Sequence, residues 1–187
     1  MREEILNSAQ KLIQQKGING MSYTDISKEV NIKNASIHHH FPTKEDLVNC
    51  LVKRFCAEFK TQVNEILTSS HKPKTKLQKF MRLFENTLLE GKNDRACLCG
   101  MLCAELLSIS EQTANLVREF LNESGRAISE ILEEGVKQKS FSLCGNVKNT
   151  SDLFLATLEG GIFLSRIDGG PERYKKLLKQ LEKTIST

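Results

Sequence analysis

Side chains that donate and accept hydrogen bonds are concentrated between residues 33 and 40. The stretch has one strong apolar anchor, Ile37. Its polar members are Lys33, Asn34, Ser36, His38 and His39. A helix with one anchor cannot bury the rest of its surface in its own core, but it can offer that surface to the major groove of B-form DNA, which is about 12 Å wide. The stretch is therefore a candidate for contacting base edges, although a small three-helix bundle with a polar face fits the same pattern.

A capping box precedes this stretch. Ser22 is followed three residues later by Asp25, which is the spacing at which a hydroxyl and an acid cap the start of a helix reciprocally. The short helix that begins there has Ile26 and Val30 as its inward residues. Asn31 then tolerates the left-handed backbone that a tight turn between two helices requires. The pattern predicts two short helices joined by a tight turn.

A second capping box follows, with Thr43 and Asp46 at the same spacing and Pro42 blocking continuation of the helix before it. Apolar residues recur with a helical period along nearly the whole chain, and no run alternates as a strand would. We therefore expect an all-α protein of about nine helices. The first helix is expected over about residues 3–16 and the last after Pro171, while residues 140–150 fit no element.

Composition narrows the classes of protein to consider. The net charge is +4, and the first 60 residues hold the larger basic excess per residue. The most apolar stretch, residues 153–167, contains Glu159 and Arg166 and falls short of the roughly 18 apolar residues of a membrane span. The charged N-terminus does not resemble a signal peptide. We expect a cytoplasmic, nucleoid-associated protein with no membrane partner, whose six cysteines are reduced thiols.

Three of the cysteines, Cys97, Cys99 and Cys103, are expected in one helix, with Cys99 and Cys103 sharing a face. They could act as small buried hydrophobes, as an electrophile or oxidant sensor helped by Arg95 and a helix N-terminus near Cys97, or as metal ligands. No neighbouring histidine supports a metal, and the three adjacent histidines at 38–40 point about 100° apart.

An enzyme is not expected, because no phosphate-binding glycine loop, nucleophile elbow or metal-ligand pair is present, and no cofactor or metal is expected. A helical adaptor that does not bind DNA is the second rival. A salt-dependent shift of promoter DNA separates both rivals from a DNA-binding regulator.

Residues 3–50 resemble the DNA reader of the TetR/AcrR family of bacterial transcriptional regulators. The residues that carry the resemblance are Ser22, Asp25, Ile26, Ile32, Ala35, Ser36, Ile37, His38, His39, His40, Phe41, Pro42, Thr43, Lys44, Glu45, Asp46 and Leu47. Three positions depart from the family pattern. Asn31 stands for the usual Gly of the turn, Lys33 for the usual Ser cap, and His38 for the usual Tyr that touches a phosphate.

The resemblance implies a helix-turn-helix DNA-binding domain over residues 1–48 and a helical ligand-binding and dimerisation domain over residues 49–187. It implies that Ser22, Thr24, His38 and Lys44 hold the DNA backbone. It also implies that Lys33, Asn34, Ser36 and His39 face base edges, with Ala35 small enough to allow close approach. The expected partner is double-stranded DNA carrying an inverted repeat.

The resemblance further implies a homodimer formed by the last two long helices, for which an ordinary monomeric core is the alternative. The expected interface residues are Leu155, Leu158, Ile162, Phe163, Leu177, Leu178 and Leu181. A pocket for a small, mainly apolar inducer is expected, with plain core as the alternative; its candidate lining is Phe84, Leu88, Cys99, Met101, Cys103 and Phe120. The implied function is a transcriptional repressor released by that ligand, or alternatively by thiol modification at Cys97, Cys99 or Cys103.

Overall fold

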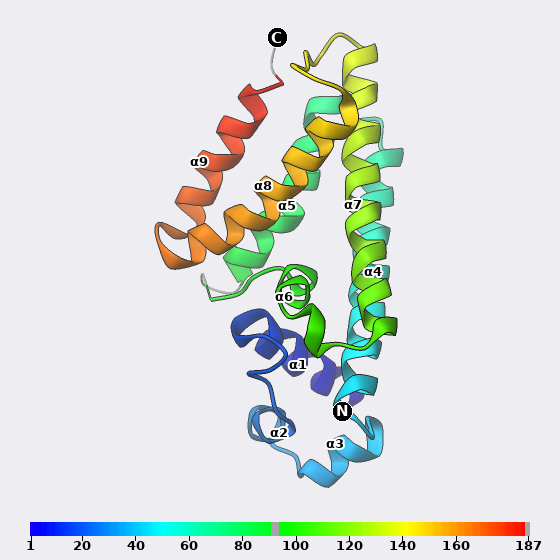
Figure 1. The fold of residues 1–187 in the computed structure, drawn as a ribbon, viewed down its shortest axis with the longest axis vertical. Helices are drawn as coiled ribbons and strands as arrows, with labels where there is room; N and C mark the ends of the chain where they lie inside the picture. The colour runs from blue at the N-terminus through cyan, green and yellow to red at the C-terminus, as the bar shows by residue number, and fades with distance from the viewer. Residues whose placement is uncertain (91–93, 186–187) are drawn as a thin grey trace. The chain divides into compact units, whose positions relative to one another are not determined.

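The computed structural model describes residues 1–90 and 94–185, and within these ranges every regular element is a helix (Figure 1). The elements are α1 (Arg2–Lys16), α2 (Tyr23–Val30), α3 (Asn34–His40), α4 (Lys44–Thr68), α5 (Pro73–Glu90), α6 (Leu98–Ala104), the 3-10 helix η1 (Leu106–Ser108), α7 (Glu111–Lys137), α8 (Val147–Ile167) and α9 (Gly170–Lys183). The all-α architecture expected from the sequence is confirmed. None of the described helices combines the length and the apolar character needed to cross a bilayer.

The chain divides into two compact units. The first comprises Met1–Glu58 with Ala96–Phe120, and the second comprises Phe59–Arg95 with Leu121–Thr187. The first unit therefore holds more than the expected domain of residues 1–48, because α6 and the start of α7 pack with the N-terminal helices. A backbone hydrogen bond of 2.9 Å from the Ala96 N–H to the Gln14 carbonyl helps to hold this later segment against α1.

Each of the four N-terminal helices contributes at least one buried apolar residue to the core of the first unit. Ile5 and Ile13 of α1, Ile26 of α2, Ile37 of α3 and Leu47 of α4 are all fully covered. Val30, which the sequence placed inward, is only half-buried. Two ion pairs on the surface add to the α1–α2 contact: Lys11–Glu29 at 2.7 Å and Lys16–Asp25 at 3.1 Å.

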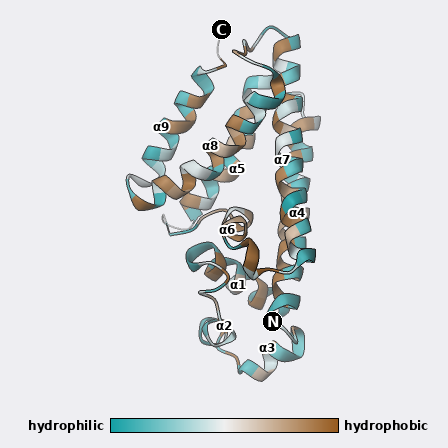
Figure 2. Cartoon of the chain, in the orientation of Figure 1, coloured by the Kyte–Doolittle hydropathy of each residue, from teal (hydrophilic) through white to brown (hydrophobic). Residues whose placement is uncertain are grey.

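The second unit has an aromatic cluster and a closely packed pair of helices. The ring of Phe59 meets those of Phe80 and Phe84 edge to face, with centroids 6.1 Å apart in both pairs. α8 and α9 lie side by side (Figure 1). The buried Tyr174 hydroxyl of α9 donates a 3.0 Å hydrogen bond to the Leu158 carbonyl of α8. Figure 2 shows hydrophilic residues interrupting the apolar ones along α9, which is the pattern of a helix with one buried face.

Candidate nucleic-acid interface

The capping box at the start of α2 forms as expected. The Ser22 Oγ accepts from the Asp25 N–H at 3.2 Å, and the Ser22 N–H donates to the Asp25 carboxylate at 3.0 Å. Hydrogen bonds from the Ser22 side chain and from Lys16 lower the pKa of Asp25 to about 2. The start of α2 is therefore fixed by a carboxylate that stays charged well into the acidic range.

The turn between α2 and α3 has the left-handed residue that the sequence predicts. Asn31 adopts φ 57° and ψ 48°, and its N–H donates to the Ser27 carbonyl. The Ser27 hydroxyl in turn donates to the Ile32 carbonyl at 2.5 Å. Asn31 thus adopts the left-handed conformation that glycine usually adopts in such a turn. This turn directs α3 so that its polar side faces outward.

The polar face of α3 lies open to solvent. Ile37 is fully buried, whereas Lys33, Asn34, Ala35, His38 and His39 are exposed and Ser36 is half-buried. Thr24 of α2 is exposed as well, and its hydroxyl accepts a 3.3 Å hydrogen bond from the Asn34 side-chain amide. The structure therefore brings the candidate base-contacting residues together on one accessible surface with Thr24 beside them.

Tyr23 is a member of this site that the sequence analysis missed. Its hydroxyl lies 2.9 Å from the Phe41 carbonyl and 2.6 Å from the Thr43 carbonyl, so its single proton bridges the turn between α3 and α4. Burial, and then the charge of Asp46, raise the pKa of Tyr23 to about 12. The only signal in the sequence was an aromatic residue directly after the cap of α2.

The Tyr23 ring also contacts the ring of His38, with centroids 4.7 Å apart. The Nδ1 atom of His38 lies 3.2 Å from the Pro42 carbonyl. Since a carbonyl can only accept, Nδ1 carries the proton in this contact and Nε2 is left for another partner. His38 is thus held between Tyr23 and Pro42 while its side chain stays exposed.

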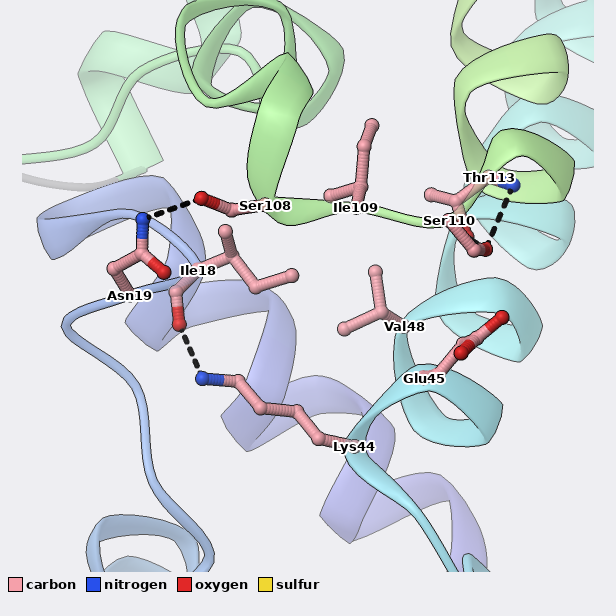
Figure 3. Close-up of a pocket in the computed structure, with 9 residues that line it drawn as sticks. All are labelled: Ile18, Asn19, Lys44, Glu45, Val48, Ser108, Ile109, Ser110 and Thr113. Atoms are coloured by element: carbon pink, nitrogen blue, oxygen red, sulfur yellow. Dashed lines mark hydrogen bonds between the residues drawn. The ribbon is translucent and has the colours of Figure 1, made fainter.

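Lys44 is placed differently from the expectation that it holds a phosphate. Its side-chain nitrogen donates to the Ile18 carbonyl at 2.5 Å (Figure 3). It also donates to the Met21 carbonyl at 2.7 Å. The side chain is half-buried, and this burial lowers the pKa of Lys44. The neighbouring Thr43 and Asp46 form the expected capping box of α4, with the Asp46 N–H donating to the Thr43 hydroxyl at 3.1 Å.

A pocket of about 250 Å³ lies beside Lys44 in the first unit (Figure 3). Its wall includes apolar Ile18 and Val48 and the polar side chains of Asn19 and Ser108. None of the six residues expected to line an inducer pocket belongs to this wall. The pocket is therefore distinct from the set proposed from the sequence.

Those six residues are divided between the two units. Phe84 and Leu88 are buried in the second unit, where Phe84 joins the aromatic cluster. In the first unit Cys99 is buried and Phe120 packs on the ring of Phe55 with centroids 5.7 Å apart. Met101 is half-buried and Cys103 is exposed.

The seven residues expected at a dimer interface fall into two groups. Leu158, Ile162, Leu178 and Leu181 are at most 7% exposed within one chain, so they belong to its own core and are not available to a partner. Leu155, Phe163 and Leu177 are half-buried. Three large apolar side chains of α8 that were not in the expected interface set are exposed: Leu153 by 52%, Leu164 by 50% and Ile167 by 87%. An accessible apolar surface on α8 therefore remains.

The cysteines agree with the expectation in part. Cys99 and Cys103 lie in α6, whereas Cys97 lies before it as its N-cap. Both Cys97 and Cys99 are buried, which fits the alternative in which they act as small hydrophobes. A hydrogen bond with the Cys99 side chain lowers the pKa of Cys56, which lies on α4. Cys56 is half-buried, and its Sγ lies 3.8 Å from the Leu116 carbonyl. Among residues 1–90 and 94–185, no group of three or more His, Cys, Asp or Glu side chains could hold a metal ion.

Comparison with known proteins agrees with this geometry. Residues 5–51, which span α1 to the start of α4, match the family described as bacterial regulatory proteins, tetR family. A solved structure of a TetR-family transcriptional regulator from Agrobacterium tumefaciens is 29% identical, superposes with a TM-score of 0.92, and the match covers 100% of this chain and 97% of that one. The chain is a member of the TetR family.

Named HTH-type transcriptional regulators are among its relatives. The HTH-type transcriptional repressor NemR of Escherichia coli strain K12 is 22% identical over 191 residues, covering 100% of this chain and 94% of NemR. The negative transcriptional regulator IcaR of the biofilm operon icaADBC in Staphylococcus epidermidis is 43% identical over 47 residues, which is 25% of each chain. The TetR resemblance is thus densest in the helix-turn-helix and extends along the whole chain in fold.

Proposed function

We propose that this TetR-family protein is a sequence-specific DNA-binding repressor that inserts α3 into the major groove. The observation that carries the proposal is the open polar face of α3, on which Asn34 and His39 are exposed while Ile37 alone anchors the helix. A helix N-terminus that presents amide and amine side chains suits the edges of adenine and guanine.

Within this proposal Lys33, Asn34, Ser36 and His39 face base edges, and Ala35 permits close approach. Ser22, Thr24 and His38 contact the phosphate backbone, where the first turns of α2 and α4 add backbone N–H groups and the positive end of the helix dipole. Lys44 stabilises the loop before α2 and does not contact DNA in this proposal, since its ammonium donates hydrogen bonds to the carbonyls of Ile18 and Met21.

A dimer accounts for the accessible apolar surface of α8. TetR-family regulators act as dimers, and Leu155, Phe163 and Leu177 together with the exposed Leu153, Leu164 and Ile167 supply apolar area for a second copy. Two readers related by two-fold symmetry would face successive turns of one duplex, about 34–36 Å apart. The expected operator is an inverted repeat.

Release from the operator is proposed to follow binding of a small, mainly apolar ligand that favours a different arrangement of the two readers. A thiol-based release is the second candidate. The specific observation in its favour is that the half-buried Cys56 shares a hydrogen bond with buried Cys99, which lowers the pKa of Cys56 and so raises its thiolate fraction.

The test is selection of duplexes from a random pool by the full chain, followed by titration of the selected duplex at several salt concentrations. We expect an inverted repeat bound by two copies, with affinity falling steeply as salt rises. Asn34→Ala combined with His39→Ala should abolish the sequence preference, whereas Lys72→Ala, an exposed change before α5, should leave it intact. Binding of the double variant with wild-type preference would contradict the assignment of α3 as the reader.

A further inference from the structure

The loop between α1 and α2 is held by a carboxylate from much later in the chain. Glu105 follows α6 directly, and its Oε2 accepts from the Ile18 N–H at 2.6 Å. Its Oε1 accepts from the Asn19 N–H at 3.1 Å and from the Asn19 side-chain amide at 2.9 Å. One carboxylate thus satisfies two consecutive backbone donors that lie beyond the end of α1, and hydrogen bonds to a charged acceptor are the stronger kind.

The loop is shaped to receive this group. Gly17 has φ +80°, and a Cβ at this position would overlap the Glu105 carboxylate. The Asn19 amide also donates to the Ser108 hydroxyl at 2.9 Å, so η1 contributes a second contact (Figure 3). A glycine with positive φ that leaves room for one particular carboxylate indicates a fitted contact rather than a casual surface pair.

The other edge of the same loop is held by Lys44. The Glu105 carboxylate accepts hydrogen bonds from the N–H groups of Ile18 and Asn19. The Lys44 ammonium donates hydrogen bonds to the carbonyls of Ile18 and Met21. The charge of Glu105 acts on Lys44 in turn and favours its protonated form. The loop is therefore fixed between a carboxylate and an ammonium, immediately before Ser22 caps α2 and at the point where α4 begins.

We propose that Glu105 is a positioning residue for DNA binding, which acts by fixing the loop at residues 17–21 and, through it, Lys44 and the start of α2. The inference rests on the proposed DNA-binding function. Glu105 lies outside the region that matches the family, residues 5–51. It contacts no base or phosphate in this proposal, since a carboxylate would be repelled by DNA.

Because DNA repels a carboxylate, the direction of the change in DNA affinity distinguishes a positioning role from a simple effect of charge. Glu105→Gln keeps the size of the side chain but replaces one acceptor oxygen with an NH2 group, which donates and cannot accept. Glu111→Gln removes the same charge from an exposed residue in the first turn of α7. Loss of a negative charge alone should tighten DNA binding slightly or leave it unchanged, and this is expected for Glu111→Gln. Glu105→Gln is expected instead to weaken binding to the selected duplex by about 10-fold.

Amide hydrogen exchange supplies a readout that does not depend on DNA. In Glu105→Gln the Ile18 and Asn19 amides should exchange faster than in the wild type, and in Glu111→Gln they should not. Asn19→Ala, which removes only the side-chain links to Glu105 and Ser108, serves if Glu105→Gln folds poorly and should weaken binding about threefold.

Binding of the wild-type chain to the selected duplex tests the proposed function independently of the contact between Glu105 and the loop at residues 17–21. If Glu105→Gln and Asn19→Ala then bind as tightly as the wild type, or more tightly as Glu111→Gln does, the positioning role is refuted. A wild-type chain that binds no duplex refutes the DNA-binding function itself and with it this role, while the exchange rates still report the contact.

Discussion

The ammonium nitrogen of Lys44 lies 2.5 Å from the backbone carbonyl oxygen of Ile18 and donates a hydrogen bond to it. A second bond of 2.7 Å to the Met21 carbonyl leaves this nitrogen with two acceptors inside the protein. By its position in the motif Lys44 was expected to hold a phosphate. The contacts show that its charge is turned toward the α1–α2 loop, and this changes what its removal should do.

Lys44→Ala should weaken binding to every duplex, because the loop before α2 loses two of its supports. The slope of log affinity against log salt should stay at the wild-type value, because a residue bonded to carbonyls releases no counterion from DNA. Fluorescence anisotropy at four or more salt concentrations measures both quantities. A slope that falls by about one unit would instead show that Lys44 contacts a phosphate directly.

Asn34→Ala should relax base preference. The Asn34 amide is exposed and bonded only weakly, at 3.3 Å, to the Thr24 hydroxyl, so it can exchange that bond for an adenine edge. Competition between the selected duplex and single-base variants should show a loss of about 1–3 kcal/mol of discrimination at one position of each half-site. Thr24→Val removes the internal bond but leaves the Asn34 amide, so it should lower affinity for all duplexes alike through its proposed phosphate contact and leave base discrimination unchanged. If Asn34→Ala and the wild type discriminate equally between the selected duplex and its single-base variants, residues other than Asn34 recognise the bases.

Stability at acid pH should depend on Asp25. The pKa of Asp25 is lowered from 3.8 to about 2 in the folded chain. Because a lowered carboxyl pKa stabilises the fold above the unfolded value, the contribution is complete above pH 3.8 and is lost as pH falls toward about 2. Urea unfolding of Asp25→Asn should therefore show a deficit relative to the wild type at neutral pH that shrinks between about pH 4 and pH 2. A deficit that is constant across this window would mean that the carboxylate charge is irrelevant to the cap.

Cys56 should react with alkylating reagents before Cys97 and Cys99 do. It is half-buried with a lowered pKa, whereas Cys97 and Cys99 are 3% and 0% exposed. Peptide mapping after brief treatment with iodoacetamide at neutral pH measures the order; the exposed Cys103 and Cys144 report the rate of accessible thiols in the same sample. In Cys56→Ser, Cys97 and Cys99 should stay unmodified until the chain is unfolded. Rapid labelling of native Cys97 would instead support the electrophile or oxidant sensor that the sequence left open as one alternative.

Features that depend on neighbours along the chain were predictable. The boxes Ser22–Asp25 and Thr43–Asp46 form because cap and acid are three residues apart, and Asn31 takes the left-handed conformation that its short amide side chain tolerates. Residues 140–150 could not be placed, because the cap that starts α8 is a lone asparagine: Asn146 accepts from the Asn149 N–H at 2.8 Å without a reciprocal acid. The sequence could not predict which residues of α8 and α9 are buried within one chain. The periodic pattern of an apolar residue such as Leu158 is the same whether its own chain or a partner covers it.

By itself the sequence determined the helices, the open polar side of α3 and the kinship that these residues imply, since all of them follow from local spacing and one buried anchor. The tertiary structure alone decided where the charges of Lys44 and Glu105 are directed and which thiol lies beside Cys56. These depend on contacts such as Glu105 with Ile18 and Cys56 with Cys99, between residues far apart in the chain. No periodicity encodes them, because each is fixed only when the helices pack and bring a donor to its acceptor.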